Sequence, residues 1–449
     1  MATRVSDALE NQLLFLGTKP ETRRDSPLAF KALLFLIFML YVAPQGFIPI
    51  LEPLHLGKVS AGIAILSYGV ATLAQGRGFT TLTSEIKLIF GFLTLAIISI
   101  PLSGWPGGSL EFFLDIFSKS VIVFFMVVNL LPNLDRLKQM IWAISLFSTI
   151  DAGIAIKNYL SGNVLFSGST GRARGGYSGL TGDPNDLALC LNIAIPFIWY
   201  LRESSQTRMQ KVLLTGMLVG CIAGVVVSFS RGGFLGLLGL FVWAVIIHTR
   251  KHGPAVLVKA ALLGVVFFAL SPGGYTDRMH SIADTSKDQT GSADVRWTVM
   301  KRAAQISLEH PFGAGLKMHN ILLKDVNTAL TGVHSAFLEV AADLGIVGGI
   351  LFAVIFLKLI LAMRAIRNSS ASSEDSKRLA EAAEVSLVAF GVSGMFLAVA
   401  YQAPYWLLAG IAISIKDVAG RMRLNVDDEP NQPAPQIVVY AVQPSERGY

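Results

Sequence analysis

The sequence predicts an all-α polytopic membrane protein with about twelve transmembrane helices. Of its 449 residues, 53% are hydrophobic and 15% are charged, whereas about 25% of the residues in an average soluble domain are charged. The mean hydropathy is +0.57. The apolar residues also recur in long runs, and about 17 to 25 apolar residues cross a bilayer as one helix. A soluble core does not require such repeated runs, so we expect a membrane protein.

The apolar runs divide the chain into spans and connections. We expect helices near 28–43, 59–74, 86–101, 110–131, 137–156, 184–201, 211–229, 232–248, 254–270, 334–363, 384–401 and 404–418. The chain then consists of a cytoplasmic leader (1–27), helices one to nine (28–270), a large, partly helical outside loop (271–333), helices ten to twelve (334–418) and a disordered cytoplasmic tail (419–449).

Lysine and arginine residues predict the orientation. Cytoplasmic connections of membrane proteins carry an excess of these residues. With a cytoplasmic N-terminus every inside connection is basic, including those that hold Arg136, Arg202, Arg250 and Arg364. Both termini are then cytoplasmic. The net charge of +7 follows from this topology, so nucleic-acid binding is not needed to explain it.

Positive charges on the outside face need another explanation, because they oppose this topology. Arg172 and Arg174 lie among glycines in GRARGGYSGLTGDPND, and further lysines and arginines lie in the loop 271–333. Glycine lets backbone N–H groups approach an anion closely, and arginines add charge. A ligand with several negative charges would account for these residues, and a simple flexible loop is the alternative for Arg172 and Arg174.

Arg231 lies within the apolar stretch VVVSFSRGGFLGLL. An arginine at the bilayer centre costs about 2.5 to 3.5 kcal/mol. We expect Gly232 and Gly233 to break the run there, which places Arg231 in a turn at the outer interface. An interfacial anchor is the simpler interpretation, but such anchors are commoner on the cytoplasmic side. A functional role is therefore favoured.

Two further segments are candidates for the same site. In TGDPND, Asp183 before Pro184 is typical of a helix N-cap. The segment 291–316 predicts an amphipathic helix with an apolar stripe, with Arg296 in its first turn, where helix N–H groups favour anions. A solvated surface arginine is the alternative there. The apolar stripe consists of Val295, Val299, Ala303 and Ile306.

The tenth span begins with a histidine followed by two acids. His334 and Ser335 lie at its outer mouth, and Glu339 and Asp343 follow on one helix face at i, i+4 spacing. Acids this close to a bilayer are expensive unless they face protein or water. A lone interfacial histidine is usually structural, but this one follows a basic loop, which favours a role in chemistry.

Taken in order, these segments resemble the O-antigen ligase and polymerase family of bacterial envelope enzymes. The resemblance rests on GLTGDPNDLALCL (179–191), SFSRGGFLGLL (228–238), SADVRW followed by LEHPFGAGL (292–316), and VHSAFLEVAADLGIVGGILF (333–352). It covers roughly 170–355. The family often has His-Asn where this chain has His334-Ser335, which puts any contribution of the asparagine in doubt.

The resemblance implies a GT-C-like ligase fold in the bacterial inner membrane, with the active site facing the periplasm. Such enzymes transfer a glycan from undecaprenyl diphosphate to a hydroxyl on lipid A-core or on another lipid-linked glycan. Arg231 and Arg296 would hold the diphosphate, and His334 would orient or deprotonate the acceptor hydroxyl. The other expected substrate-binding residues are Arg172, Arg174, Asp183, Asn185 and Arg302, with Glu339 and Asp343 in support.

This chemistry agrees with the residue types. A diphosphate is a good leaving group, so the transition state needs charge stabilisation, which arginine supplies with a planar fork suited to phosphate oxygens. A histidine with an ordinary pKa of about 6.5 accepts a hydroxyl proton near neutrality. Attack on the face opposite the diphosphate inverts the anomeric centre.

We expect neither a cofactor nor a metal. The first outside loop offers a single acid, Glu52, whereas metal-dependent polyprenyl glycosyltransferases place acidic pairs there. Asp183 and Asp186 could hold a cation, but capping accounts for Asp183 and the arginines supply the charge. Cys190 and Cys221 fall inside predicted spans, which predicts buried thiols rather than a disulfide or metal site.

Ligase and polymerase stay open as alternatives, because both use the same donor and leaving group; we favour a ligase. A transporter of polyprenyl-linked glycans is a less favoured alternative. Transporters tend to carry repeats and polar groups near the midplane, whereas the charges of this chain gather at one face. A purely structural role would leave the outer arginines and His334 unexplained.

Overall fold

The structure, a computed structural model, describes residues 26–76, 78–167, 170–176, 179–269, 271–280, 292–323 and 332–427. Over these residues the chain is almost wholly helical. One antiparallel hairpin joins β1 (Leu165–Ser167) to β2 (Thr170–Arg172), with Leu165 opposite Arg172. The predicted all-α class is confirmed.

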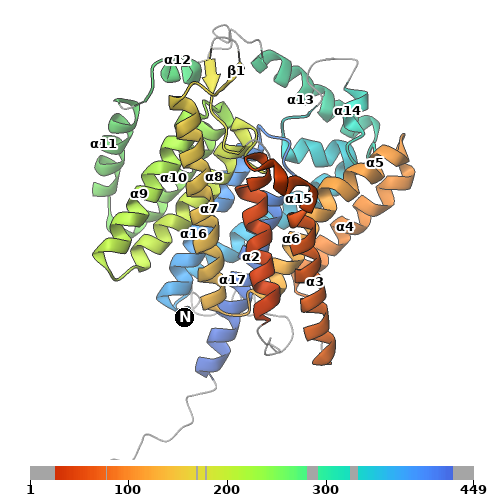
Figure 1. The fold of residues 1–449 in the computed structure, drawn as a ribbon, viewed down its shortest axis with the longest axis horizontal. Coiled ribbons are helices and arrows are strands. Elements are labelled where there is room, and N and C mark those ends of the chain that lie inside the picture. Colours follow the sequence, from red (N-terminus) through yellow and green to blue (C-terminus); the bar gives the residue numbers. More distant parts are fainter. Residues whose placement is uncertain are drawn as a thin grey trace, which may run out of the picture.

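The helices pack into one bundle (Figure 1). In chain order they are α2 (Pro27–Tyr41), η1 (Pro44–Gly46), η2 (Pro49–Leu54), α3 (Leu56–Ala74), α4 (Ser84–Leu102), α5 (Pro106–Phe112), the π-helical η3 (Phe113–Phe117), α6 (Ser118–Leu130), α7 (Leu134–Leu160), α8 (Pro184–Ser204), α9 (Arg208–Val227), α10 (Arg231–His252), α11 (Ala255–Ala269), α12 (Tyr275–His280), α13 (Ser292–Glu309), α14 (His319–Leu322), α15 (Ala336–Asn368), α16 (Glu374–Gly394) and α17 (Ala403–Asp427). We call the end that carries the hairpin, α12 and α13 the hairpin end.

Nine helical segments among the described residues are long and apolar enough to cross a membrane. Each of the twelve predicted spans overlaps a described helix. The three outside those nine segments, at 254–270, 384–401 and 404–418, overlap α11, α16 and α17, but the span at 384–401 begins ten residues after the start of α16 and runs past its end at Gly394. The protein is a multi-pass membrane protein, and the number of its spans stays a prediction.

The predicted boundaries can be compared with the helices. The leader lies outside the described residues up to 25, and α2 begins at Pro27. Helix α17 continues to Asp427, so the predicted start of the tail at 419 falls inside a helix, and 428–449 lie outside the described residues. The loop 271–333 contains α12, α13 and α14. The amphipathic helix predicted there is confirmed as α13, whose Val299, Ala303 and Ile306 are buried.

The middle of the bundle packs around α8. Close helix–helix approach depends on small residues in membrane proteins, and a Cβ added to Gly236 of α10 would lie 1.9 Å from Ser393 Oγ of α16. At the same crossing, Asn192 Nδ2 of α8 donates to the Gly233 carbonyl at 2.8 Å. Cys190 and Cys221 are buried and free, as predicted. The close crossings hold α8, α10 and α16 at fixed positions.

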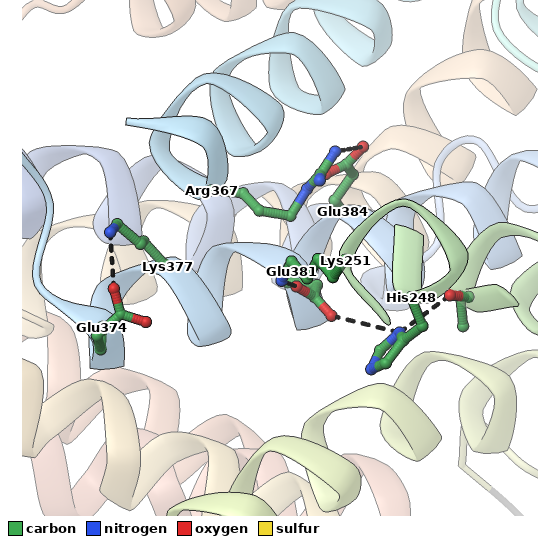
Figure 2. Close-up of polar contacts among 8 residues, drawn as sticks. His248, Lys251, Arg367, Glu374, Lys377, Glu381 and Glu384 are labelled. Atoms are coloured by element: carbon green, nitrogen blue, oxygen red, sulfur yellow. Dashed lines mark hydrogen bonds and ion pairs between the residues drawn. The ribbon is translucent and has the colours of Figure 1, made fainter. Parts of the chain in front are cut away.

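Ion pairs join the helices at the end opposite the hairpin (Figure 2). Arg367 of α15 donates from Nε to Glu384 Oε2 of α16 at 2.7 Å, and Glu384 is fully buried. Lys251 of α10 pairs with Glu381, and His248 Nδ1 lies 3.8 Å from the same carboxylate. Because one partner of each cross-helix pair lies on α16, these contacts fix α10 and α15 against it.

Helix α15 is broken at Gly345, where φ is 75° and ψ is −178°. The loop after α13 supplies the missing backbone partners: the N–H of Ile346 donates to the Pro311 carbonyl at 3.1 Å, and the Asp343 carbonyl accepts from Gly315 at 2.9 Å. A Cβ at Gly345 would lie 2.2 Å from the Pro311 oxygen. The break leaves a short segment, 336–344, clamped to the loop.

Candidate active site

The turn between α9 and α10 places Arg231 at the hairpin end. Phe229 adopts a left-handed conformation with φ 47°, which reverses the chain. Ser230 then caps α10, because its Oγ accepts a hydrogen bond from the Gly233 N–H at 3.0 Å. Arg231 is the first residue of α10 and is 9% exposed. The predicted turn is confirmed, and it sets Arg231 at a helix end rather than within a span.

The predicted cause of this turn was wrong. Gly232 and Gly233 do not break the run; both lie in the first turn of α10, and the chain reverses at 228–230. Glycine is needed at 233 for packing, because a Cβ there would lie 2.4 Å from the Ala188 Cβ of α8. The two glycines therefore let α10 approach α8.

Arg172 lies against this turn. Its Nη2 donates to Asn185 Oδ1 at 2.7 Å, and its Nε donates to the Ser228 carbonyl at 3.2 Å. Ser230 Oγ donates to the same Asn185 oxygen at 2.8 Å. One amide therefore joins β2, α8 and the α9–α10 turn, and it holds Arg172 beside the turn that carries Arg231.

Arg278 of α12 also lies at the turn between α9 and α10, and it is a site residue that the sequence did not single out. Its Nε donates to the Phe229 carbonyl at 2.9 Å, next to the Ser228 carbonyl that Arg172 uses. The turn therefore orients two arginines through consecutive carbonyl groups. The only sequence signal for Arg278 was its place among the positive charges of the outside loop.

Four arginines share one electrostatic environment. The pKa of Arg172 is lowered to about 10, first by burial and then by the positive charges of Arg278, Arg296 and Arg231, while Asp183 acts in the opposite direction. Arg172 remains charged at neutral pH. The structure thus brings together three arginines that the sequence predicted, from β2, α10 and α13, and adds the one from α12.

His334 lies directly before α15 and belongs to the same group. Its backbone is left-handed, with φ 47°. The pKa of His334 is lowered to about 4, chiefly by burial, with Arg296 and Lys317 lowering it further and Asp183 opposing them. Its Nε2 is buried and has no hydrogen-bond partner among the described residues. The ordinary pKa expected from the sequence was wrong, because two cations face a buried ring.

Asp183 has the capping role that its sequence context predicts. Its Oδ1 accepts from the Asn185 N–H at 2.7 Å, and Pro184 is the first residue of α8. Its carboxylate also favours the charged forms of Arg172 and His334. Asp183 therefore both begins α8 and supplies the negative charge that the arginine cluster faces.

Glu339 and Asp343 face the loop after α13. Glu339 accepts from Lys317 Nζ at 2.9 Å and from the Ala400 N–H at 3.3 Å. Asp343 Oδ1 lies 2.6 Å from His319 Nδ1, and both side chains are fully buried. These acids hold the loop to the first segment of α15, which supports His334 at the start of that segment.

Two predicted residues lie apart from these contacts. Arg302 donates from Nη1 to Glu309 Oε1 at 2.7 Å. It lies six residues after Arg296 on α13, about 9 Å along the axis and on another face. The Arg174 carbonyl accepts from Asn158 Nδ2 at 3.1 Å, which fixes the backbone after β2. The charges that shift the pKa values of Arg172 and His334 do not include Arg174 or Arg302.

The arrangement suits an anion with more than one negative charge beside a neutral imidazole. Arginine forks bind phosphate oxygens in pairs, and the arginines come from four separate elements, three of which (β2, α10 and α12) meet at the turn between α9 and α10. A neutral histidine with a free ring nitrogen can accept a proton. The site can therefore bind a diphosphate and receive a proton next to it.

Residues 187–353 match the family model described as O-antigen ligase. This range includes Arg231, Arg278, Arg296 and His334, and begins shortly after Arg172 and Asn185. The match confirms the family resemblance of the sequence motifs. A comparison with curated proteins finds no match to the chain.

Proposed function

We propose that this chain, whose residues 187–353 match the O-antigen ligase family model, transfers a glycan from undecaprenyl diphosphate to an acceptor hydroxyl at the periplasmic face of a bacterial inner membrane. A ligase- or polymerase-type glycosyl transfer from lipid-linked glycans follows from the family in general. The donor, the acceptor on lipid A-core, the mechanism and the location are our proposal.

The observation that carries the proposal is that the charges of Arg231, Arg278 and Arg296 all act on Arg172, and that the charge of Arg296 also acts on His334. A diphosphate gains negative charge on its leaving oxygen as the glycosidic bond breaks. Preorganised cations stabilise this charge without reorganising during the reaction. A cluster held by a helix cap, an amide and two backbone carbonyls fits that requirement.

The transfer is one displacement. The acceptor oxygen attacks the anomeric carbon, the carbon–oxygen bond to the diphosphate breaks, and the electron pair stays on the diphosphate. The acceptor proton passes to His334 and from there to solvent. Attack opposite the leaving group inverts the anomeric centre. Neither a metal nor a cofactor has a part in these steps, because the arginines carry the charge stabilisation.

Donor binding would also adjust His334. A bound diphosphate brings negative charge to the cations that disfavour imidazolium, so it favours protonation of the ring. His334 would become a better base when the donor is in place. A polymerase would use the same steps with a second lipid-linked glycan as acceptor.

Arg231 gives the direct test. In Arg231→Lys the charge stays but the fork is lost, so undecaprenyl diphosphate should bind about tenfold more weakly and transfer should fall about 100-fold. Arg208→Lys is the matched control, because Arg208 is the first residue of α9 as Arg231 is of α10. Binding is measured on protein in nanodiscs. Equal binding and transfer in both variants would reject the diphosphate site.

A deletion strain separates ligase from polymerase. Loss of all capped glycan on a lipopolysaccharide gel supports the ligase. Capping with a single repeat would instead identify a polymerase. An unchanged gel would show that the chain acts on a different polymer.

A further inference from the structure

A second polar cluster contains Lys317, whose charge acts on His334 but is not among the charges that act on Arg172. Lys317 follows α13, Glu339 lies in the first segment of α15, and Phe112 ends α5. In Figure 1 the hairpin and α12 lie on one side of the hairpin end, and α14 and α5 lie on the other. The charges of Arg296 on α13 and of Lys317 on the following loop both lower the pKa of His334.

Lys317 is held in place by its surroundings. Its ammonium lies 2.9 Å from Glu339 Oε1 and 5.4 Å from the centre of the Phe112 ring. Its backbone is left-handed, with φ 63°. Two residues on, His319 bonds to Asp343 in a fully buried pair. The lysine is therefore fixed at both its backbone and its charged end.

Both carboxylate oxygens of Glu339 are used inside the protein, one of them by Lys317, so Glu339 positions Lys317 and does not bind a ligand. Its side chain is 2% exposed, and its two oxygens accept from Lys317 and from the Ala400 N–H. The Lys317 side chain is 27% exposed. An ammonium has three donors, and the ion pair with Glu339 occupies one of them. Although burial lowers the pKa of Lys317, Glu339 and Asp343 outweigh it and raise that pKa, so the side chain stays charged.

The direction of attack assigns a use to these donors. In a displacement the acceptor approaches the anomeric carbon from the face opposite the diphosphate, and it must also reach His334. With the diphosphate on the arginines, Lys317 is the cation acting on His334 that the donor leaves for the acceptor. An ammonium with spare donors beside the half-buried ring of Phe112 suits a hydroxyl-rich sugar, because donors bind hydroxyl oxygens and an aromatic ring packs on apolar C–H faces.

We propose that Lys317 binds the acceptor saccharide by donating hydrogen bonds to its hydroxyl groups, with Glu339 as the residue that positions the ammonium. This inference rests on the proposed transfer and names the acceptor side of the same site. It divides the site into a donor half built from arginines and an acceptor half built on the loop between α13 and α14.

The test measures both halves separately in Lys317→Gln. The protein is placed in nanodiscs with lipid-linked glycan and envelope glycolipid extracted from the host. We expect the KM for the glycolipid to rise about tenfold or more, which is the loss of one charged hydrogen bond. The KM for the donor and the affinity for undecaprenyl diphosphate should stay unchanged. Lys317→Arg, which keeps the charge, should recover most of the lost acceptor affinity.

Two controls keep the result interpretable. Lys301→Gln removes another lysine that lies over an aromatic ring, Trp297, at 5.2 Å, and should leave both KM values unchanged. Lys317→Gln leaves Glu339 buried without its cation, which destabilises folding. The double variant Lys317→Gln/Glu339→Gln removes that buried charge, and it should fold and still show the raised acceptor KM.

Three outcomes would overturn the inference. A raised donor KM, or weaker undecaprenyl diphosphate binding, in the Lys317 variants would place Lys317 in the donor half. An unchanged acceptor KM in the folded double variant would show that the Lys317–Glu339 ion pair is only a structural contact. Failure of the proposed function looks different, because Arg231→Lys would then bind undecaprenyl diphosphate like the unaltered protein.

Discussion

His334 illustrates how position changes the chemistry of one residue. A histidine in water is half protonated near pH 6.5. Here burial and two neighbouring cations lower the pKa to about 4, so the ring is neutral throughout the physiological range. A free acceptor nitrogen is thereby available before substrate arrives.

We predict that this lowered pKa sets the acid limit of activity. The groups facing His334 are Arg296 of α13, Lys317 of the following loop and Asp183 at the start of α8. Since the base works in its neutral form, kcat/KM should stay level down to about pH 5 and fall as pH drops through about 4. The acid fall of kcat should occur at a higher pH than that of kcat/KM, because the bound diphosphate favours the protonated form of His334. Initial rates over pH 3.5 to 8 measure both limbs.

Arg296→Gln sharpens this prediction. The variant removes a cation that opposes protonation, so the remaining activity should lose its acid tolerance and the kcat/KM limb should move towards 6.5. Samples returned to pH 7 before assay control for acid damage. The assigned role of His334 would be contradicted if kcat/KM of the wild-type protein already fell near pH 6.5, or if this pH were the same in Arg296→Gln.

At the scale of elements, glycines shape the site more than charges do. Gly345 interrupts α15 and lets the loop carbonyl of Pro311 reach the Ile346 N–H. Glycine alone adopts this backbone region readily, and any side chain would meet the Pro311 oxygen. The segment that begins beside His334 depends on this one position.

Gly345→Ala should therefore destabilise the folded protein by several kcal/mol, from backbone strain and from the clash with Pro311. The melting temperature in detergent, followed by intrinsic fluorescence, should fall clearly. Gly216→Ala is the matched control: Gly216 lies within α9 with open space around its Cα, and alanine favours a helix there. Equal melting temperatures for the two variants would show that the break carries no strain.

The same glycine shows what a sequence can predict. The motifs around 313 and 345 were recognisable as family features, and the span that includes them was predicted from its apolar run. The break was not, because it depends on backbone partners 28 and 35 residues away in the chain, in the contacts of Asp343 with Gly315 and of Ile346 with Pro311. Arg278 and Lys317 were equally out of reach, since only the turn at 228–230 and the first segment of α15 bring them to the site.

At the scale of the whole molecule, hydropathy was enough to locate the helices, because each predicted span overlaps one, although the span at 384–401 is displaced along α16. Which helices touch was not predictable from apolar runs alone. Close crossings such as that of Gly236 with Ser393 depend on three-dimensional fit. Of the arginines predicted from their place on one face, Arg231 and Arg296 act on Arg172, because the topology puts their elements at the same end, whereas Arg174 and Arg302 lie apart.

The predicted orientation can be tested with single cysteines. Phe166 of the hairpin is 74% exposed and Met209 at the start of α9 is 81% exposed, and they lie at opposite ends of the bundle. A membrane-impermeant maleimide on intact cells with a permeable outer membrane should label Phe166→Cys and not Met209→Cys. Cys190 and Cys221 are fully buried, so the maleimide should not label them. The reverse labelling would invert the topology.

The break in α15 also has a mechanical consequence. The short segment 336–344 is bonded through its backbone to the loop at 311–315, whereas the long segment beyond Gly345 runs through the bundle. A tilt of the long segment, such as a change in bilayer thickness imposes, is absorbed at the joint. We expect His334 then to move with the loop that bears Lys317 and with α13, which precedes that loop and bears Arg296, so that the spacing of the reacting groups is insulated from the membrane around them.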